Sequence, residues 1–341
     1  MKPIYLQVIL VLFVLFTACD SGEKTKQDTS FTITVNASEP GAIYLDGQYT
    51  GYTTPAELKV SEGQYVIGVA TQTSHSYLRK ELTINEDTDL MLTTADKPEP
   101  KVWKALWVGV HEVTGLSESG QCSSQFSKEE LDAGYDFFMW SIENHFEPFS
   151  FNTTKWEVER KDINTPIQLH KASNTWFTLE PESITELIPE IDAGNYDAVF
   201  VFWREKDGSC SFKSSYFGLA WIDPLNDPIK TGYITIKFDA GDNIQDNINW
   251  YKENDPGVWV HEWLHTVGEN YFQDRGERMP EKGGDGLVLH AAEKYQYTYP
   301  WMDWYRDFMT GQVKELGSGH TYCGIGPEAL LQKSLRESAM E

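Results

Sequence analysis

The stretch GVWVHEWLHTVGENY, residues 257–271, carries His261, Glu262 and His265 in the order H-E-x-x-H. On an α-helix the two histidines lie one turn apart on the same face, so both imidazoles can reach one metal ion. Neutral imidazole nitrogen is a common zinc ligand, and the pattern predicts a site for one Zn²⁺. Glu262 can reach a water beside the metal and is predicted to be its general base. A structural helix with two hydrogen-bonded histidines is the alternative.

The residues around this motif strengthen the metal hypothesis. Glu262 is the only charged residue of VWVHEWLHTV, which predicts a helix buried at the base of a cleft. Burying these polar groups without a metal or partners would be unfavourable. With these uncharged flanks the stretch resembles the extended signature of the zincin metallopeptidases. The resemblance implies a zinc-dependent hydrolase that acts on a peptide or protein. Tyr271 occupies the position where metzincins carry their third ligand, so the third ligand must lie further along the chain.

A second segment, GGDGLVLHAAEKYQYTY at residues 283–299, offers candidates for that third ligand. His290 lies among apolar residues and is the first choice, with Glu293 or Asp285 as alternatives. Glu293 shares a helix face with His290 at i and i+3, so it could instead orient the histidine. Among the nearby tyrosines, Tyr297 is the first choice for a hydrogen-bond donor to the oxyanion of a tetrahedral intermediate. The order of HEWLH, a Gly/Asp-rich run with a histidine, and WMDWYRDFMTGQV also resembles exported zincin-like proteins of bacteria.

The rest of the C-terminal region, residues 103–341, alternates between strand and helix patterns. VWKALWVGVHEV and YDAVFVFW are continuous apolar runs, and the second predicts a central strand buried on both faces. By analogy with zincins, YDAVFVFW is also a candidate for the edge that binds substrate. SKEELDAGYDFFMWSIENHF and PESITELIPEIDAG have helical periodicity, and Ser127 with Glu130 forms a capping signature at the start of the first. The predicted fold is an α/β (α+β) domain with a mixed sheet around the H-E-x-x-H helix.

Three cysteines lie in this region. Cys122 and Cys210 each occur in a polar, Gly/Ser-rich segment, and they are the expected disulfide pair in an oxidising compartment. Cys323 would then remain free. The chain contains no C-x-x-C pair, so the sequence does not support a cysteine zinc cluster.

The N-terminal part of the chain has a different pattern. Residues 31–92 alternate apolar and polar residues and contain Asp46-Gly47, a strong hairpin signal, which predicts a small all-β module. The run EPGAIYLDGQYTGYTTPAELKVSEGQYVIGV resembles a PEGA domain. This resemblance implies an extracytoplasmic, β-sandwich-like module with a role in binding or spacing and without an active site. The polar segment TTADKPEPKV, residues 93–102, predicts a linker to the second domain.

The first residues predict export. Lys2 precedes an apolar run too short to be a convincing membrane span, and LFTAC ends at Cys19. This resembles a bacterial lipobox, which implies a signal peptide over residues 1–18, a lipid on Cys19 and a polar tether over residues 19–30. The expected location is therefore the cell envelope, with the protein anchored to a bacterial membrane and facing the periplasm or the cell surface.

The charge of the chain limits its partners. The formal net charge is −24, which argues against nucleic-acid binding because phosphate backbones would repel the protein. Two hypotheses remain open. The first is a lipid-anchored zinc metallopeptidase. The second is a non-catalytic surface protein with a structural zinc, whose PEGA-like module binds a wall polymer or a surface partner.

Overall fold

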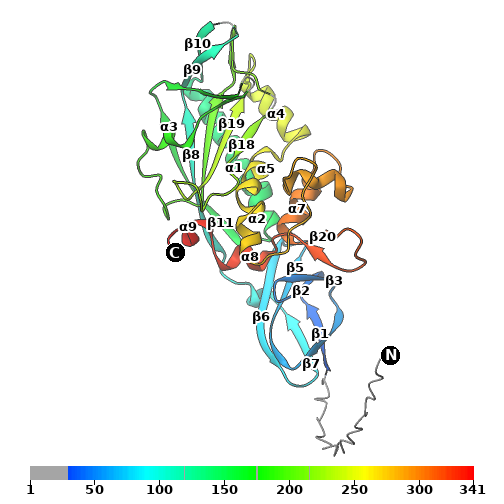
Figure 1. Cartoon of the computed structure of the whole chain (residues 1–341). Helices are drawn as coiled ribbons and strands as arrows, with labels where there is room; N and C mark the ends of the chain where they lie inside the picture. Colours follow the sequence, from blue (N-terminus) through cyan, green and yellow to red (C-terminus); the bar gives the residue numbers. More distant parts are fainter. Residues whose placement is uncertain (1–29, 119, 174–175, 215) are drawn as a thin grey trace, which may run out of the picture.

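The computed structural model describes residues 30–118, 120–173, 176–214 and 216–341 of the chain. The expected signal peptide, Cys19 and the tether up to residue 29 lie outside the described residues. Within the described part, no helix is long and apolar enough to cross a membrane. Figure 1 shows two parts, a small N-terminal module of strands and a larger C-terminal domain of strands and helices.

The N-terminal module consists of two sheets packed face to face, with strand orders β4-β1-β7 and β3-β2-β5-β6. Alternate residues of both sheets, among them Ile33, Ile43 and Ile67, are fully buried between them. At the predicted hairpin turn, Asp46 has a φ of 50° and Gly47 a φ of 81°, the positive values that a type I′ turn requires. The strands are β1 (Ser30–Ala37), β2 (Gly41–Leu45), β3 (Gln48–Thr53), β4 (Ala56–Ser61), β5 (Gly63–Thr71), β6 (Ser76–Ile84) and β7 (Thr88–Leu92).

The C-terminal domain is built on a five-stranded sheet of order β11-β8-β15-β19-β18. Its strands are β8 (Lys101–Val110), β11 (Thr154–Ile163), β15 (Ala198–Arg204), β18 (Gly218–Ala220) and β19 (Gly232–Phe238). The first four strands in this order run parallel and β18 runs antiparallel to β19, so the sheet is mixed as predicted. The run YDAVFVFW supplies β15, the middle strand, and its residues 198–203 are buried.

Helices cover one face of this sheet, as Figure 1 shows. They are α1 (Lys128–Ser141), α4 (Ile244–Asn254), α5 (Val258–Gly268) and α7 (Met302–Thr310), and they enclose the larger apolar core. Ser127 caps α1 in a capping box with Glu130, as the sequence predicts. The opposite face is covered by α3 (Pro181–Thr185) and a hairpin of β9 (Glu112–Ser117) and β10 (Gly120–Gln125). The helix expected from PESITELIPEIDAG is limited to α3, because Pro189 disfavours helical backbone at the residue before it.

Short elements complete the domain and its connections. They are η1 (Thr94–Asp96), η2 (Ile142–Phe146), α2 (Glu147–Phe149), β12 (Ile167–Gln168), β13 (His170–Ser173), β14 (Trp176–Thr178), β16 (Lys206–Asp207), β17 (Cys210–Ser211), α6 (Tyr271–Asp274), η3 (Leu289–Tyr295), β20 (Val313–Lys314), β21 (Tyr322–Cys323), α8 (Pro327–Gln332) and α9 (Leu335–Ala339). The expected linker, residues 93–102, thus contains η1 and the first two residues of β8.

The N-terminal module is docked on the C-terminal domain through polar side chains of β2 and β6. The Tyr44 hydroxyl donates to the carbonyl oxygen of Thr310 at 2.8 Å, at the end of α7. Glu328 of α8 accepts from Nε of Arg79 at 3.0 Å and from the hydroxyl of Tyr77 at 3.3 Å. Glu328 is only 4% exposed, so this ion pair lies inside the interface.

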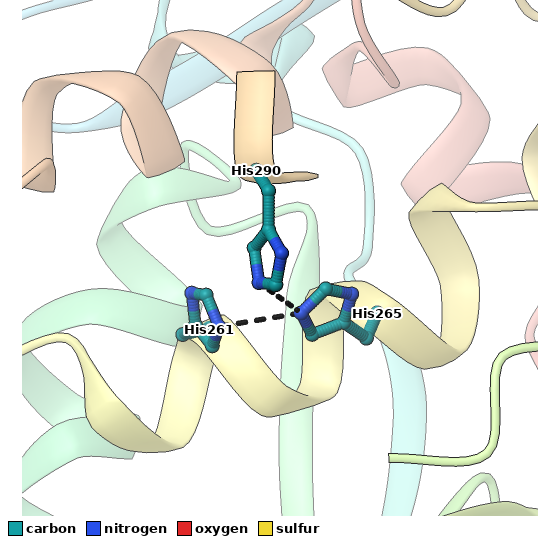
Figure 2. Close-up of side chains that lie close together, drawn as sticks. All are labelled: His261, His265 and His290. Carbon is teal, nitrogen blue, oxygen red and sulfur yellow. Dashed lines mark hydrogen bonds between the residues drawn. The ribbon is translucent and has the colours of Figure 1, made fainter. Parts of the chain in front are cut away.

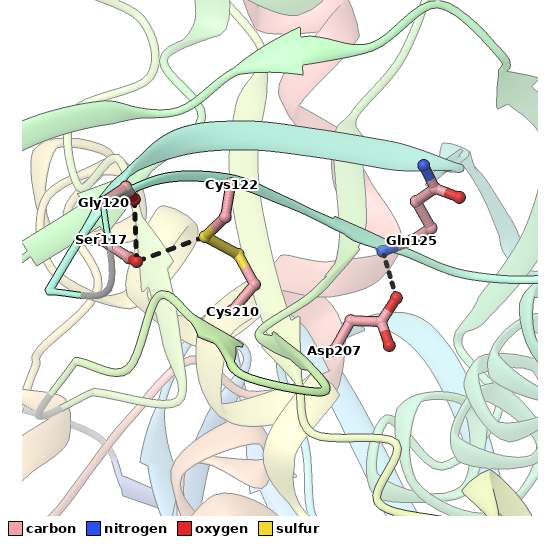
Figure 3. The surroundings of a disulfide bond; sticks show 6 residues. All are labelled: Ser117, Gly120, Cys122, Gln125, Asp207 and Cys210. Atoms are coloured by element: carbon pink, nitrogen blue, oxygen red, sulfur yellow. Dashed lines mark hydrogen bonds between the residues drawn. A yellow bond between two sulfur atoms is a disulfide. The ribbon is translucent and has the colours of Figure 1, made fainter.

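A disulfide joins the hairpin on the second face to the segment after β15 (Figure 3). It links Cys122 of β10 to Cys210 of β17, with 5.8 Å between the Cα atoms, and it is the pair expected from the sequence. Cys323 is free and buried.

Candidate metal centre

The helix α5 forms the floor of the candidate site. All its residues are buried except His261, which is partly exposed. Glycines flank the point where α7 crosses it: a Cβ at Gly257 would lie 2.6 Å from the ring of Tyr305, and one at Gly268 would lie 2.7 Å from the ring of Phe308. The absence of these side chains lets α7 pack directly on α5.

Three histidine rings point toward one another above this helix (Figure 2). His261 and His265 come from α5, and His290 comes from η3. The Nε2 atom of His265 lies 3.2 Å from the Nε2 atoms of both other histidines. The structure therefore brings together the two histidines of the motif and the first-choice third ligand, 25 residues away in the sequence.

Each outer nitrogen of the three rings faces an oxygen atom. Nδ1 of His261 lies 2.9 Å from the hydroxyl of Tyr305. Nδ1 of His265 lies 3.1 Å from Oε1 of Glu269, and Nδ1 of His290 lies 2.5 Å from Oδ2 of Asp285. An ionised carboxylate can only accept, so the Nδ1 atoms of His265 and His290 carry the protons.

The protonation states of the three rings indicate whether a metal ion can bind between their Nε2 atoms. Burial lowers the pKa of His261 well below its usual range and also lowers the pKa of His265, so both rings are neutral near pH 7. A neutral ring that is protonated on Nδ1 presents a lone pair on Nε2, and facing lone pairs repel unless a cation lies between them. Two imidazole nitrogens at about 2.0–2.1 Å from one tetrahedral zinc lie roughly 3.3 Å apart. The two separations of 3.2 Å that involve His265 are therefore compatible with a metal ion, and the ligand atoms of all three rings lie within 4.8 Å of one another.

Glu262 differs from the other carboxylates of the site because no described residue donates a hydrogen bond to it. It is 6% exposed, and its Oε1 atom lies 3.8 Å from Nε2 of His261. Burial raises the pKa of Glu262 to about 8. A cation held by the histidines would lower that pKa again, because an opposite charge favours the ionised form. Burial and a bound cation would therefore act on the pKa of Glu262 in opposite directions.

The site opens into a cavity of about 600 Å³. The three histidines and Glu262 line it together with Gly218, Leu219 and Ala220 of β18, and aromatic walls are supplied by Trp176, Tyr216, Phe217, Trp301 and Tyr305. β18 is the last strand of the sheet among the described residues, and all three of its residues line the cavity. Gly218 packs on the general-base candidate, since a Cβ there would lie 2.6 Å from Cδ of Glu262.

Neither alternative ligand belongs to the converging group, and the expected oxyanion donor does not line the main cavity. Asp285 holds the outer nitrogen of His290, and Glu293 is exposed on the wall of an adjoining cavity of about 330 Å³. The hydroxyl of Tyr297 donates to Oδ2 of Asp307 at 2.8 Å, and Tyr297 is not among the residues that line the main cavity. Its aromatic neighbourhood indicated proximity to the site, but the direction of a side chain on a short loop does not follow from composition.

Sequence reasoning missed three parts of the site. YDAVFVFW is the middle strand β15, so the free edge at the cavity belongs to β18, whose three residues are too few to show strand alternation. Tyr305 lies in an aromatic run that predicts packing as readily as function. Glu269 had a usable signal, because it follows His265 at i+4 and therefore shares its helix face.

Comparisons with known proteins support the prediction made for the N-terminal module. Residues 30–95 match the family model of the PEGA domain, which confirms the resemblance stated for residues 31–92. Among solved structures, metalloproteinase-II from Bacteroides fragilis is 11% identical, with 70% of this chain and 74% of that chain covered and a TM-score of 0.26. A TM-score of this size does not establish a shared fold. No curated protein matches the chain.

Proposed function

We propose that the C-terminal domain is a zinc-dependent metallopeptidase with Glu262 as its general base. The observation that carries the proposal is the convergence of three imidazole nitrogens beside a buried glutamate on the floor of a cavity of about 600 Å³. His261, His265 and His290 would hold the ion. A zinc ion held there would supply a Lewis acid that polarises a carbonyl oxygen and lowers the pKa of a water to about 7.

The side chains of the site would then move the protons. Glu262 takes a proton from the water whose oxygen attacks the carbonyl carbon, and it returns this proton to the amide nitrogen as the C–N bond breaks. With Nε2 of His261 on the ion, its Nδ1 would carry the proton and donate to the hydroxyl oxygen of Tyr305, which would leave the hydroxyl proton free to be donated toward the cavity. Tyr305 therefore replaces Tyr297 as the proposed donor to the developing oxyanion.

The free edge of β18 supports a peptide as the substrate. Gly218, Leu219 and Ala220 line the cavity, and within the described part of the chain β18 pairs with a strand on one side only, β19. The unpaired N–H and C=O groups of an edge strand can pair with an extended peptide. This arrangement would lay a peptide backbone across the three histidines, which favours peptide hydrolysis over hydrolysis of a smaller amide.

The geometry supports a catalytic site more than a structural one. Structural zinc sites are closed by four protein ligands, whereas catalytic sites keep one position open. The converging group contains three histidines, and neither Asp285, which accepts from the outer nitrogen of His290, nor Glu293 belongs to it. A non-catalytic surface protein with a structural zinc is therefore the less supported function.

The location and the partners complete the proposal. The protein would be anchored to a bacterial membrane by a lipid on Cys19, with the N-terminal module available to a cell-wall or surface partner. The substrate would be a peptide or a protein. The net charge of −24, together with a cavity that no described lysine or arginine lines, disfavours nucleic acid as a ligand.

Hydrolysis of a mixed peptide library by the purified protein tests this function. We expect cleavage that a chelator stops and added zinc restores. Glu262→Gln should lower the rate by about 100-fold or more while zinc content stays at that of the wild type. Glu293→Gln, which changes an exposed carboxylate on the adjoining wall, serves as the control and should retain activity. A wild-type protein that binds no zinc would end the proposal.

A further inference from the structure

We propose that Glu269 is a positioning residue that holds two of the three metal ligands at once. It orients His265 directly and holds the backbone segment that carries His290. The inference rests on the metal site of the proposed function, but it does not depend on the reaction that the site performs.

The contacts of Glu269 reach two separate parts of the chain. Oε1 accepts from Nδ1 of His265 at 3.1 Å and from the backbone N–H of Leu289 at 3.0 Å, and Oε2 accepts from the backbone N–H of Val288 at 2.6 Å. The side chain is 1% exposed, so water does not compete for these bonds. Hydrogen bonds to an ionised group are roughly twice as strong as neutral ones. One buried carboxylate therefore ties the end of α5 to the start of η3.

This tie matters because the third ligand lies at the end of an irregular segment. Glu269 and the buried bond from Nε1–H of Trp304 to the carbonyl oxygen of Leu289, at 2.9 Å, hold the end of that segment. Between α6, which ends at Asp274, and η3, which begins at Leu289, the described chain forms no helix or strand. The segment contains Gly283, Gly284 and Gly286, which give the backbone little conformational restriction. The ring of His290 can meet the other two histidines only if the start of η3 is held near α5, and Glu269 makes that contact.

The three groups that orient the histidines differ in strength. Tyr305 is neutral, and Asp285 has a side chain that is 50% exposed, so solvent weakens its bond to His290. Glu269 alone is both charged and buried. We therefore expect it to contribute the most to metal affinity. Because linkage is reciprocal, metal binding should in turn protect the segment that Glu269 holds.

The matched control is Asp197, a buried carboxylate that contacts none of the ligands. It is 0% exposed and accepts from the backbone N–H groups of Lys104 at 2.7 Å and of Arg336 at 2.6 Å, as well as from the side chain of Arg336. Asp197→Asn thus removes a buried carboxylate that, like Glu269, accepts from two backbone N–H groups, although its side-chain partner is a charged arginine. It should lower the stability of the fold without changing metal affinity.

The experiment measures zinc affinity of the full-length protein by competition with a chromophoric chelator, for the wild type, Glu269→Gln and Asp197→Asn. Glu269→Gln should lose about 10–100-fold in affinity, as is typical when a group that orients a ligand is removed. Asp197→Asn should stay within about two-fold of the wild type. A folded Glu269→Gln protein with wild-type affinity would overturn the proposal, even if its melting temperature fell.

Amide exchange of the wild-type protein keeps the test valid if Glu269→Gln does not fold. The peptide that contains Val288 and Leu289 should exchange several-fold more slowly with zinc than without it. Unchanged exchange in that peptide would contradict the proposed tie. If the wild type binds no zinc, the metal site and this inference fail together. If it binds zinc but cleaves no peptide, only the proposed function fails.

Discussion

The ion pair between the N-terminal module and the C-terminal domain allows a quantitative prediction. Glu328→Ala removes a carboxylate that is 5% exposed, and with it both 3.0 Å contacts of Arg79 Nε and the 3.3 Å bond from Tyr77. Breaking a buried pair costs about 3–5 kcal/mol, but Arg79 is 25% exposed and keeps Glu81 as a partner, so about 2–3 kcal/mol is the appropriate range. The Tyr77 hydroxyl also loses its acceptor, which adds about 1 kcal/mol to the loss of stability. We expect a total loss of about 3–4 kcal/mol.

Urea unfolding of the full chain, followed by tryptophan fluorescence and circular dichroism, measures this loss. Glu81→Gln is the matched control, because it removes a carboxylate that is 70% exposed from the same arginine and should cost less than about 1 kcal/mol. A double-mutant cycle of Glu328→Gln with Arg79→Met should give a coupling of at least about 1 kcal/mol. If Glu328→Ala were no more costly than Glu81→Gln, the two parts of the chain would not be docked as described.

Two further predictions concern acid stability and the general base. Burial lowers the pKa of His145 from 6.5 to about 4. Between these two pH values the histidine is protonated in the unfolded chain but neutral in the folded protein. The free energy of unfolding therefore falls as the pH drops from 6.5 to about 4. Between pH 7 and pH 4.5 the free energy of unfolding, measured in urea, should fall by about 2 kcal/mol more in the wild type than in His145→Gln. Equal losses in the two proteins would contradict the burial of His145. Gly218→Ala would place a Cβ 2.6 Å from Cδ of Glu262 and should lower peptidase activity at least about ten-fold without loss of zinc, a result checked by parallel rate and metal measurements. Full activity in this variant would show that Glu262 tolerates displacement.

The sequence predicted best those features that neighbouring residues determine. The histidines of α5 follow from helical periodicity, and the turn at Asp46-Gly47 follows from the φ values that only a few residues adopt readily. The middle position of YDAVFVFW followed from its unbroken apolar character, because both faces of a central strand are covered. In each of these cases the neighbouring residues carry the information.

Features that depend on tertiary contacts were predicted less well. His290 could be named as the first choice, but no rule of spacing excluded Asp285 or Glu293, since the loop before η3 has no periodicity. Tyr297 was chosen for its position in an aromatic segment, yet its hydroxyl is bonded to Asp307. Which side chain of a cluster faces a cavity is decided by how distant elements pack, and that information is not contained in a short window of sequence.

Packing and hydrogen bonding shift the pKa values of the carboxylates around the three histidines in different directions. Glu269 is buried, but three hydrogen bonds outweigh the burial and lower its pKa, and a bond from His290 lowers the pKa of Asp285. Both therefore stay ionised and keep the histidines protonated on Nδ1. Glu262 is also buried but receives no such bond from the described residues, so its pKa rises to about 8. Environments that push the pKa values of similar groups apart identify the group that exchanges protons. This criterion supports the proposed proton-transfer role of Glu262 and the proposed role of the two other carboxylates in holding the ligands.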